Sequence, residues 1–441
     1  MKKLILFFFV FLSYNLFSQT WDFMYNEDFL PIEPYSGGRH EYLRAKNIIA
    51  HNDEILICRK GYENVIMIYN QTKKEWRNIT LDSIYKTIKG EHSYTKYDFE
   101  EIREITFDSK ERLWGTTANK ILCIFQDTTL VFNQVYNTEK NQFLDITHIR
   151  DLKPDKKGNI WAIVDNVVTV PYDPFVSLCK FQDSCFVTVN SQKKVAPFVD
   201  GLRLRIAFDN FGKVYHTNSD TLYILENDEV VKKIAIWDLP EGRSYFSSIE
   251  IDKNNVVYIM NTNMMLYIID GDNYYSEDFA LKSERLLAPQ MKSRAYSYMS
   301  LDSNDNVWII GSITPVLYKF DTNRNWTVID IPQPETATDD FYYKERIAID
   351  KYGKIWIPAQ ATLGTFGYGI YIYNSDTTIS SVEQPSIETA GLPDVWIRNL
   401  YPNPANLNAT LTFFLERNVS NECKIEIYNT LGMKVKDITE Q

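Results

Sequence analysis

Pairs of short apolar strands joined by one polar turn recur along most of this chain. A typical copy has Ile105 and Phe107 two residues apart, followed by Asp108 and then by Leu113-Trp114. Side chains two residues apart in a strand lie on one face, so each apolar pair contributes two residues to a core. The aspartate begins a tight turn, in which its carboxylate can accept hydrogen bonds from nearby backbone N–H groups. The pattern predicts an antiparallel strand pair.

The same pattern occurs six times at a regular spacing. Its aspartates, which lie 47, 54, 43, 50 and 48 residues apart, are Asp108, Asp155, Asp209, Asp252, Asp302 and Asp350. A glycine three residues on, or an asparagine such as Asn255 or Asn306, supplies the positive φ of the turn. An aromatic third strand follows, and in places a fourth, which is marked by Trp76 or Trp326. A period of about 40–50 residues with four short strands is typical of a β-propeller blade.

A shortened copy at residues 48–57 brings the number of copies to seven. We therefore expect an all-β fold, a seven-bladed propeller of four-stranded blades over residues 19–383. Thr20–Met24 is expected to pair with the last blade, since closure by a chain end removes free strand edges. The alternative is that Thr377–Glu383 supplies this strand. The tryptophans that recur in register are expected to lie between blades, and they are Trp114, Trp161, Trp308 and Trp356.

The repeat resembles the two-component-regulator propeller repeat, whose consensus is Asp-x-x-Gly-x-Leu-Trp followed by Gly-Thr. Trp114-Gly115-Thr116 matches best, and the resemblance covers about residues 44–383. That family often forms the extracytoplasmic sensor part of hybrid histidine kinases that detect polysaccharide fragments. The resemblance therefore implies a binding role, although propellers carry many unrelated activities.

The first 18 residues are typical of a signal peptide. Lys2-Lys3 is followed by the apolar run Leu4–Leu12 and by Leu16-Phe17-Ser18, which predicts cleavage before Gln19. No later run reaches the ~18 apolar residues of a membrane-spanning helix. We expect export through the periplasm and no membrane-spanning segment.

A different pattern follows a turn-rich linker at residues 384–398. Residues 399–441 resemble part of the C-terminal sorting domain of the type IX secretion system of Bacteroidetes, which here predicts a small, incomplete β-sandwich-like segment. The positions that match its motifs are Tyr401, Pro402, Asn403, Pro404 and Gly432. The resemblance implies that this secretion machinery is a partner, and that the protein is secreted or held on the outer cell surface. We expect the tail to pack little against the propeller, because so few strands bury little surface.

Charge and composition exclude several classes of function. A net charge of −11 argues against nucleic acid as a partner, because phosphates require a basic surface. Five cysteines are too few for a disulfide scaffold. Cys58 and Cys123 are expected to be buried thiols, whereas Cys179 and Cys185 are either bonded to each other or free. Scattered histidines and the lack of a nucleophile elbow or phosphate loop predict no catalytic residues, no metal and no cofactor.

Topology places the candidate ligand face opposite the aspartate turns. The connections on that face are long and rich in tyrosine, and they are Leu81–Glu101, Tyr136–His148, Asn190–Leu202, Lys282–Tyr296, Pro332–Lys344 and Pro358–Tyr368. Loops on a rigid scaffold commonly carry binding residues, so we expect a glycan or protein ligand there. The alternative is that the loop aromatics pack on one another.

The strand nearest the propeller axis begins with polar or charged residues in most copies. The candidate ligand-binding residues, four or five positions before the motif aspartate, are Arg103, Arg150, Arg205, Tyr298 and Arg346. One interpretation is a ring of salt bridges that seals the channel. The other is a site for an anionic or polyhydroxylated ligand, since guanidinium groups suit carboxylated sugars. In an open site, replacing Arg205 and Arg346 with alanine would abolish binding and leave the melting temperature nearly unchanged.

The sequence thus predicts a secreted or cell-surface binding module without enzymatic activity, for a polysaccharide or protein ligand. The alternative is an extracellular lyase or hydrolase that acts on polysaccharides. A pair of carboxylates about 5–10 Å apart at the loop face would favour that alternative.

Overall fold

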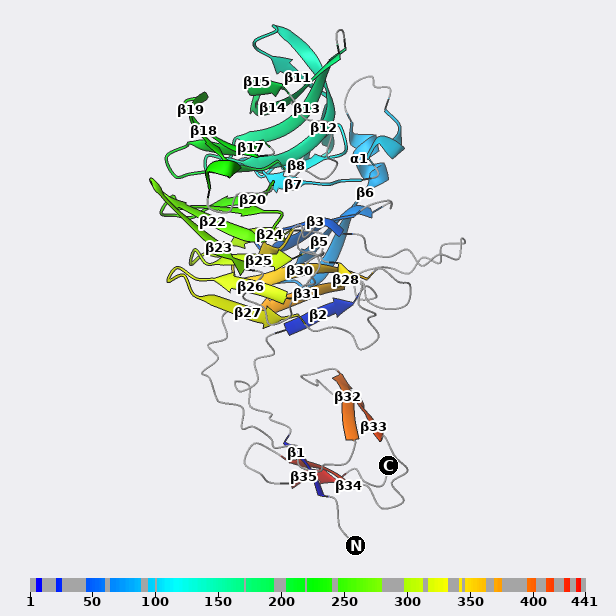
Figure 1. Ribbon diagram of the computed structural model, residues 1–441. Coiled ribbons are helices and arrows are strands. Elements are labelled where there is room, and N and C mark those ends of the chain that lie inside the picture. The colour runs from blue at the N-terminus through cyan, green and yellow to red at the C-terminus, as the bar shows by residue number, and fades with distance from the viewer. Residues whose placement is uncertain are drawn as a thin grey trace. The chain divides into compact units, whose positions relative to one another are not determined.

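The computed structural model describes residues 5–9, 21–25, 45–59, 64–88, 94–99, 101–169, 172–193, 204–218, 220–239, 245–279, 297–311, 316–331, 341–342, 346–361, 369–374, 395–401, 410–415, 424–428 and 434–437. The chain divides into two compact units. The larger comprises Trp21–Asp376, and the smaller combines Met1–Thr20 with Thr377–Gln441. Strands dominate both units (Figure 1).

Six open sheets form the blades of the larger unit within the described residues, and five of them are four-stranded antiparallel meanders. Their strands are β3 (Ala45–His51), β4 (Glu54–Arg59), β5 (Asn64–Asn70) and β6 (Glu75–Thr80); β7 (Ile105–Phe107), β8 (Leu113–Thr116), β9 (Ile121–Phe125) and β10 (Thr128–Phe132); β16 (Ile206–Phe208), β17 (Val214–Asn218), β18 (Thr221–Glu226) and β19 (Glu229–Ala235); β20 (Phe246–Ile251), β21 (Val257–Asn261), β22 (Met265–Asp270) and β23 (Asn273–Asp278); and β24 (Ser297–Leu301), β25 (Val307–Gly311), β26 (Val316–Phe320) and β27 (Trp326–Asp330).

The sixth open sheet joins the two ends of the propeller chain. It contains β28 (Phe341–Tyr342), β29 (Ala348–Ile349), β30 (Lys354–Ala361), β31 (Gly369–Asn374) and β2 (Trp21–Tyr25). β2 pairs antiparallel with β31, with Trp21 opposite Tyr373. This pairing confirms that the N-terminal segment closes the last blade. The alternative strand from Thr377–Glu383 lies outside the described residues, and β31 already has β30 on its other edge.

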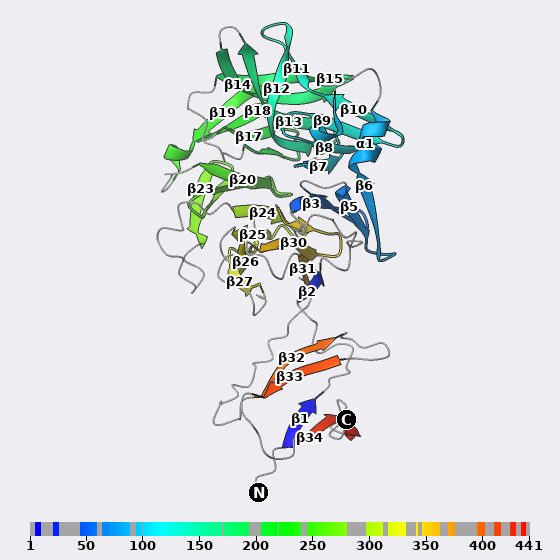
Figure 2. The same ribbon diagram turned by 90° about the vertical axis from the view of Figure 1, so that its right-hand side faces the viewer.

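The prediction of seven four-stranded blades is wrong at one position. Where the third blade was expected, a closed barrel forms from β11 (Gln134–Asn137), β12 (Gln142–Pro154), β13 (Ile160–Thr169), β14 (Tyr172–Gln182) and β15 (Cys185–Lys193) (Figure 2). β11 pairs antiparallel with β12 and parallel with β15, which closes the sheet on itself. The strands of 9 to 13 residues carry bulges, and bulges increase the coiling that closure needs. Tyr136–His148, expected as a loop, belongs to these strands.

The barrel nevertheless takes the place of a blade in the ring. The strands nearest the axis are β3, β7, β12, β16, β20, β24 and β29; each contacts the next, and β29 contacts β3. One face of the barrel packs against Trp114 of β8, and the other packs against the core of the β16–β19 blade. The four motif tryptophans are at most 2% exposed, as expected for residues between blades.

The motif aspartates organise the turns in one repeated way. In the last copy, Asp350 Oδ1 accepts the backbone N–H groups of Tyr352 and Lys354, both at 2.9 Å. Asp350 Oδ2 accepts Nε1–H of Trp356 at 2.9 Å. The same three bonds recur at Asp108, Asp155 and Asp302, with tyrosine hydroxyls replacing indoles at Asp209 and Asp252. In the Asp302 turn the positive φ belongs to Asp305, not to Asn306 as expected.

The described residues of the smaller unit form two sheets. β1 (Ile5–Phe9) pairs parallel with β34 (Lys424–Tyr428), which pairs with β35 (Lys434–Asp437). β32 (Val395–Tyr401) pairs with β33 (Thr410–Leu415). Residues 5–9 of the expected signal peptide thus form a strand at the edge of this sheet. The linker was expected to extend to residue 398, but β32 already begins at Val395. How the tail packs on the propeller stays a prediction.

Candidate ligand site on the propeller axis

One position of the repeat varies between blades. It is the axial position, the fourth residue before the motif aspartate, and its occupants are Glu104, Asp151, Arg205, Ser248, Tyr298 and Arg346, with Asn47 in the shortened first copy. These residues lie in the inner strands or directly before them, so the closed ring of strands gathers all seven around the axis. The repeat therefore keeps the geometry of this layer constant while its chemistry changes.

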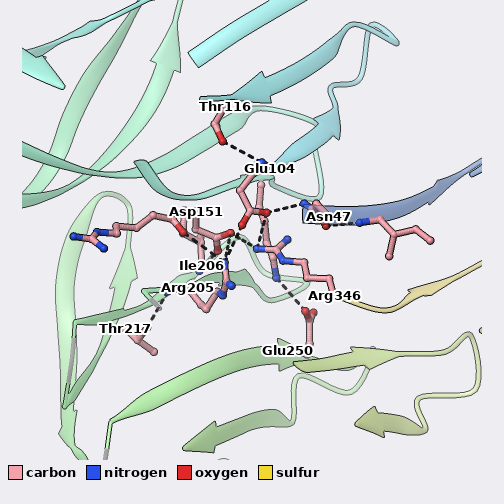
Figure 3. A network of polar contacts seen from close by, with 12 residues as sticks. Asn47, Glu104, Thr116, Asp151, Arg205, Ile206, Thr217, Glu250 and Arg346 are labelled. Atoms are coloured by element: carbon pink, nitrogen blue, oxygen red, sulfur yellow. Dashed lines mark hydrogen bonds and ion pairs between the residues drawn. The ribbon is translucent and has the colours of Figure 1, made fainter. Parts of the chain in front are cut away.

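Four of these residues form an ion-pair layer across the axis, made of Glu104, Asp151, Arg205 and Arg346 (Figure 3). Asp151 Oδ1 lies 2.6 Å from Arg346 Nη2 and 3.2 Å from Arg205 Nη1. Glu104 contacts the same two arginines, at 3.1 Å from Arg346 Nη2 and 3.4 Å from Arg205 Nη1. Each guanidinium thus bridges two carboxylates from different strands.

Backbone and amide donors complete this layer. Asp151 Oδ2 accepts the N–H of Ile206 at 2.8 Å, and Glu104 Oε2 accepts Nδ2–H of Asn47 at 2.8 Å. Burial by itself would raise the pKa of Asp151, but Arg346, Arg205 and Lys153 lower it to about 2. Burial opposes the charge of Arg346, yet Glu104 and Asp151 raise its pKa above the usual value. Asp151 and Arg346 are therefore both charged near neutral pH.

A cavity of about 210 Å³ lies beside the ion-pair layer. Its polar lining consists of Lys153, Arg205, Ser248, Glu250, Tyr298, Ser300 and Arg346. Lys153 and Glu250 lie two residues after the axial position of their strands, so alternation points them the same way. Lys153 Nζ lies 3.1 Å from Glu250 Oε1. The side chain of Glu250 is 29% exposed and that of Asp151 is 0% exposed, so solvent access increases away from the ion-pair layer.

The structure brings only part of the predicted site together. Arg205, Arg346 and Tyr298 line the cavity. Arg103 instead lies 3.3 Å from Glu101, and Arg150 pairs with the buried Asp165 of β13. The four arginines therefore do not form one site. The ion pairs of Arg205 and Arg346 agree with the interpretation that salt bridges seal the channel.

Sequence reasoning missed Lys153 and Glu250 as cavity residues. Both sit two positions before a motif aspartate, where other copies carry small or polar residues such as Ala207, Ser300 and Ala348. The sequence could have identified both residues, because side chains two residues apart in a strand lie on one face and the axial position two residues earlier was already a candidate.

Two of the expected loop-face aromatics, Tyr85 and Tyr94, are packed. Leu81–Glu101 contains α1 (Leu81–Thr87), capped by Thr80 and Ser83, and the 3-10 helix η2 (Lys96–Phe99). Tyr85 and Tyr94 are partly buried against the core cluster under this segment. Most residues of the later loops from 282 onward lie outside the described part. This segment therefore packs against the blade core, and whether the aromatics of the other loops pack on one another stays a prediction.

Other candidate chemistry gives no second site in the described part of the chain. No group of three or more His, Cys, Asp or Glu side chains there is placed to hold a metal. Cys58, Cys123 and Cys179 are buried thiols, and Cys185 is also free, so Cys179 and Cys185 are not bonded. His216 is buried against Tyr223, and burial lowers its pKa to about 4. None of the described helices is long and apolar enough to cross a membrane.

Comparison with known families identifies the tail. Residues 399–441 match the family described as the secretion system C-terminal sorting domain. This match covers the expected motif residues. A search of curated proteins found no match for the chain.

Solved structures similar to this chain are propellers. The extracellular domain of the hybrid two-component system BT3049 from B. thetaiotaomicron is 16% identical, with a TM-score of 0.50, and the alignment covers 90% of this chain and 48% of that one. The corresponding domain of BT4673 is 13% identical, with a TM-score of 0.50, covering 89% and 45%. A streptogramin B lyase is 11% identical, with a TM-score of 0.49, covering 80% and 97%. The likeness shows a β-propeller fold, and the sorting tail implies a secreted or cell-surface protein.

Proposed function

We propose that this protein is a non-enzymatic binding module, whose propeller holds a polysaccharide or protein ligand outside the cell. Residues 1–18 would direct passage to the periplasm, and residues 399–441 would engage the type IX secretion machinery. The observation that carries the binding role is the polar cavity on the axis of a propeller joined to a sorting tail. The extracellular domains of hybrid two-component systems that share its fold support a sensing or capture role by analogy.

The chemistry of Asp151 supports a structural role for this carboxylate over a catalytic one. A glycoside hydrolase requires a carboxylic acid that is protonated near the working pH. Asp151 is the most buried carboxylate at the axis, and its pKa of about 2 keeps it ionised. Its oxygens are occupied by Arg346, Arg205 and the N–H of Ile206. Such a group holds the ring together and does not donate a proton.

A glycan array probed with the folded full chain tests the binding role, combined with lyase and hydrolase assays on the same glycans. We expect binding to a subset of glycans and no turnover. Turnover of any bound glycan would show the enzyme alternative to be correct. In a separate test, removal of residues 399–441 should leave the protein inside the cell envelope, whereas the intact chain reaches the medium or the outer surface.

A further inference from the structure

We infer that the axial cavity binds a single neutral monosaccharide unit, and not an acidic sugar. This inference rests on the proposed binding function and names the ligand of the axial cavity. It follows from the donors and acceptors that the cavity leaves available, from its charge balance and from its size.

Arg346 provides unused hydrogen-bond donors. Both of its carboxylate contacts are made by Nη2, and its side chain is 20% exposed and lines the cavity. A guanidinium carries five N–H groups, so Nη1 and Nε keep three of them without a partner among the described residues. Asp151 and Glu104 both hold Nη2, which anchors the Arg346 guanidinium beside the cavity while Nη1 and Nε stay available as donors.

Glu250 provides the matching acceptor. Its Oε1 accepts Nζ–H of Lys153 at 3.1 Å, and Oε2 has no partner among the described residues. Glu250 reaches from β20 toward the space below Arg346 (Figure 3). The hydroxyls of Ser248 and Ser300 line the same cavity and can either donate or accept. A sugar diol suits this arrangement, because one hydroxyl accepts from Arg346 while its neighbour donates to Glu250.

Charge balance separates a neutral sugar from an acidic one. The ion-pair layer and the cavity lining together hold three cations and three carboxylates, which are Lys153, Arg205, Arg346, Glu104, Asp151 and Glu250. A uronate would add a negative charge to a neutral, half-buried site beside Glu250, without a free cation to compensate its desolvation. A neutral sugar adds no charge.

Size limits the ligand to one ring. The cavity volume of about 210 Å³ is below the roughly 300–1,000 Å³ of pockets that hold drug-sized ligands. The ion-pair layer blocks one end, since Arg205 and Asp151 are at most 5% exposed. Among the described lining residues, Lys153 and Glu250 are 20% and 29% exposed. An internal unit of a polysaccharide would need both ends open.

Titration calorimetry on the full chain, with matched pairs of sugars, tests the inference. The probes are glucose against glucuronate, galactose against galacturonate and mannose against mannuronate. We expect one neutral sugar to bind at least about tenfold more tightly than its uronate. Glu250→Gln should weaken that neutral sugar about tenfold, because a hydrogen bond to a charged acceptor is lost. The same variant should strengthen the uronate, because the cavity then has one excess cation.

Glu226→Gln is the matched control. Glu226 forms an exposed pair with Lys213 at 3.3 Å, so this variant makes the same charge change outside the cavity and should leave affinity unchanged. Arg346→Lys keeps the charge opposite Asp151 but loses the planar donors, and it should abolish binding while the far-UV circular dichroism spectrum stays native.

Three results would overturn the inference: equal or tighter binding of the uronate, no calorimetric signal with any of the six sugars, or unchanged affinity in Glu250→Gln. Glycan-array binding that persists in Glu250→Gln would refute the cavity as the site and leave the proposed binding function intact.

Discussion

The turn face and the axis of this propeller are built from the same repeat. The repeat keeps the same residue at the turn face but varies the residue at the axis. At the turn face, six aspartates accept equivalent sets of backbone and ring bonds, copy after copy. At the axial position the role changes from copy to copy: Glu104 and Asp151 accept, Arg205 and Arg346 donate, and Tyr298 is a buried aromatic residue. The repeated residues make the same local bonds in each blade, whereas the varied residues make one ion-pair layer that joins different blades.

The two regions also differ in how far their bonds reach. Each turn aspartate bonds groups within six residues of itself, so a turn is complete before the propeller closes. The axial bonds join residues as far apart as Asp151 and Arg346, which are separated by 195 positions. The axial layer therefore forms only when the ring of blades is closed.

The largest effect is expected at the axis. Arg205→Ala leaves Asp151, whose side chain is 0% exposed, with one cation in place of two, and removes a contact to Glu104. Breaking a buried pair in this way costs about 3–5 kcal/mol of unfolding free energy. This replaces the expectation, made for an open pocket, that the arginine could be removed without changing the melting temperature. Urea denaturation of the full chain measures the loss of unfolding free energy in Arg205→Ala.

An exposed pair is the control for this prediction. Lys213→Ala removes a cation that is 33% exposed and should change the unfolding free energy by less than about 1 kcal/mol. A comparably small loss in Arg205→Ala would mean that the axial layer contributes no more than a surface pair.

A turn aspartate should come next in size. Asp350→Ala removes the acceptor of two backbone N–H groups and of the buried Trp356 Nε1–H, with an expected cost of about 3 kcal/mol. Asp321→Ala is the matched comparison, because Asp321 makes the same two backbone bonds in an exposed turn but none to an indole. It should cost about 1 kcal/mol. Equal losses would show that the indole bond adds nothing.

Features that depend on local bonds could be predicted from the sequence, whereas those that depend on bonds between distant residues could not. The turns were predictable because Asp350, Gly353 and Trp356 lie within one short segment whose chemistry is local. The bond between the aspartate and the indole was missed, although the constant spacing of six residues was visible. The closing strand at Trp21 was predictable because its tryptophan resembled those of other outer strands.

The barrel and the axial partners could not be predicted in the same way. Closure of the barrel depends on Val135 pairing with Phe186, and no local feature marks that contact. The sequence showed arginines at the start of inner strands but not which carboxylate each would meet. Arg150 found Asp165 on its own neighbouring strand, whereas Arg346 crossed to Asp151. Arg150 lies five residues before its motif aspartate and Arg346 lies four, and this difference of one position decides which carboxylate each arginine meets.

Acid should weaken the axis in a defined pH range. The pKa of Asp151 is about 2 in the folded chain, against about 3.9 for an unperturbed aspartate. Because the folded value is the lower one, the stability from this group is present above about pH 4 and is lost as the pH falls toward 2, to an extent of about 2 kcal/mol. Unfolding free energies of the wild type and Asp151→Asn should therefore converge between pH 4 and 2. Parallel curves would contradict the assignment.

The smallest effect concerns the contact between neighbouring turns. Comparing alanine variants of two glycines distinguishes the loss of stability from this contact from the loss caused by backbone strain. Gly158 and Gly212 occupy the same turn position with φ of 78° and 88°, so alanine at either one is strained by about 1 kcal/mol. A Cβ at 158 would also lie 2.4 Å from Cβ of Ser109 in the preceding turn, whereas nothing lies within 4 Å at 212. Gly158→Ala should therefore lose about 1 kcal/mol more than Gly212→Ala in thermal or urea unfolding. If the two variants lose the same amount, the turns are joined only through their blades and not through each other.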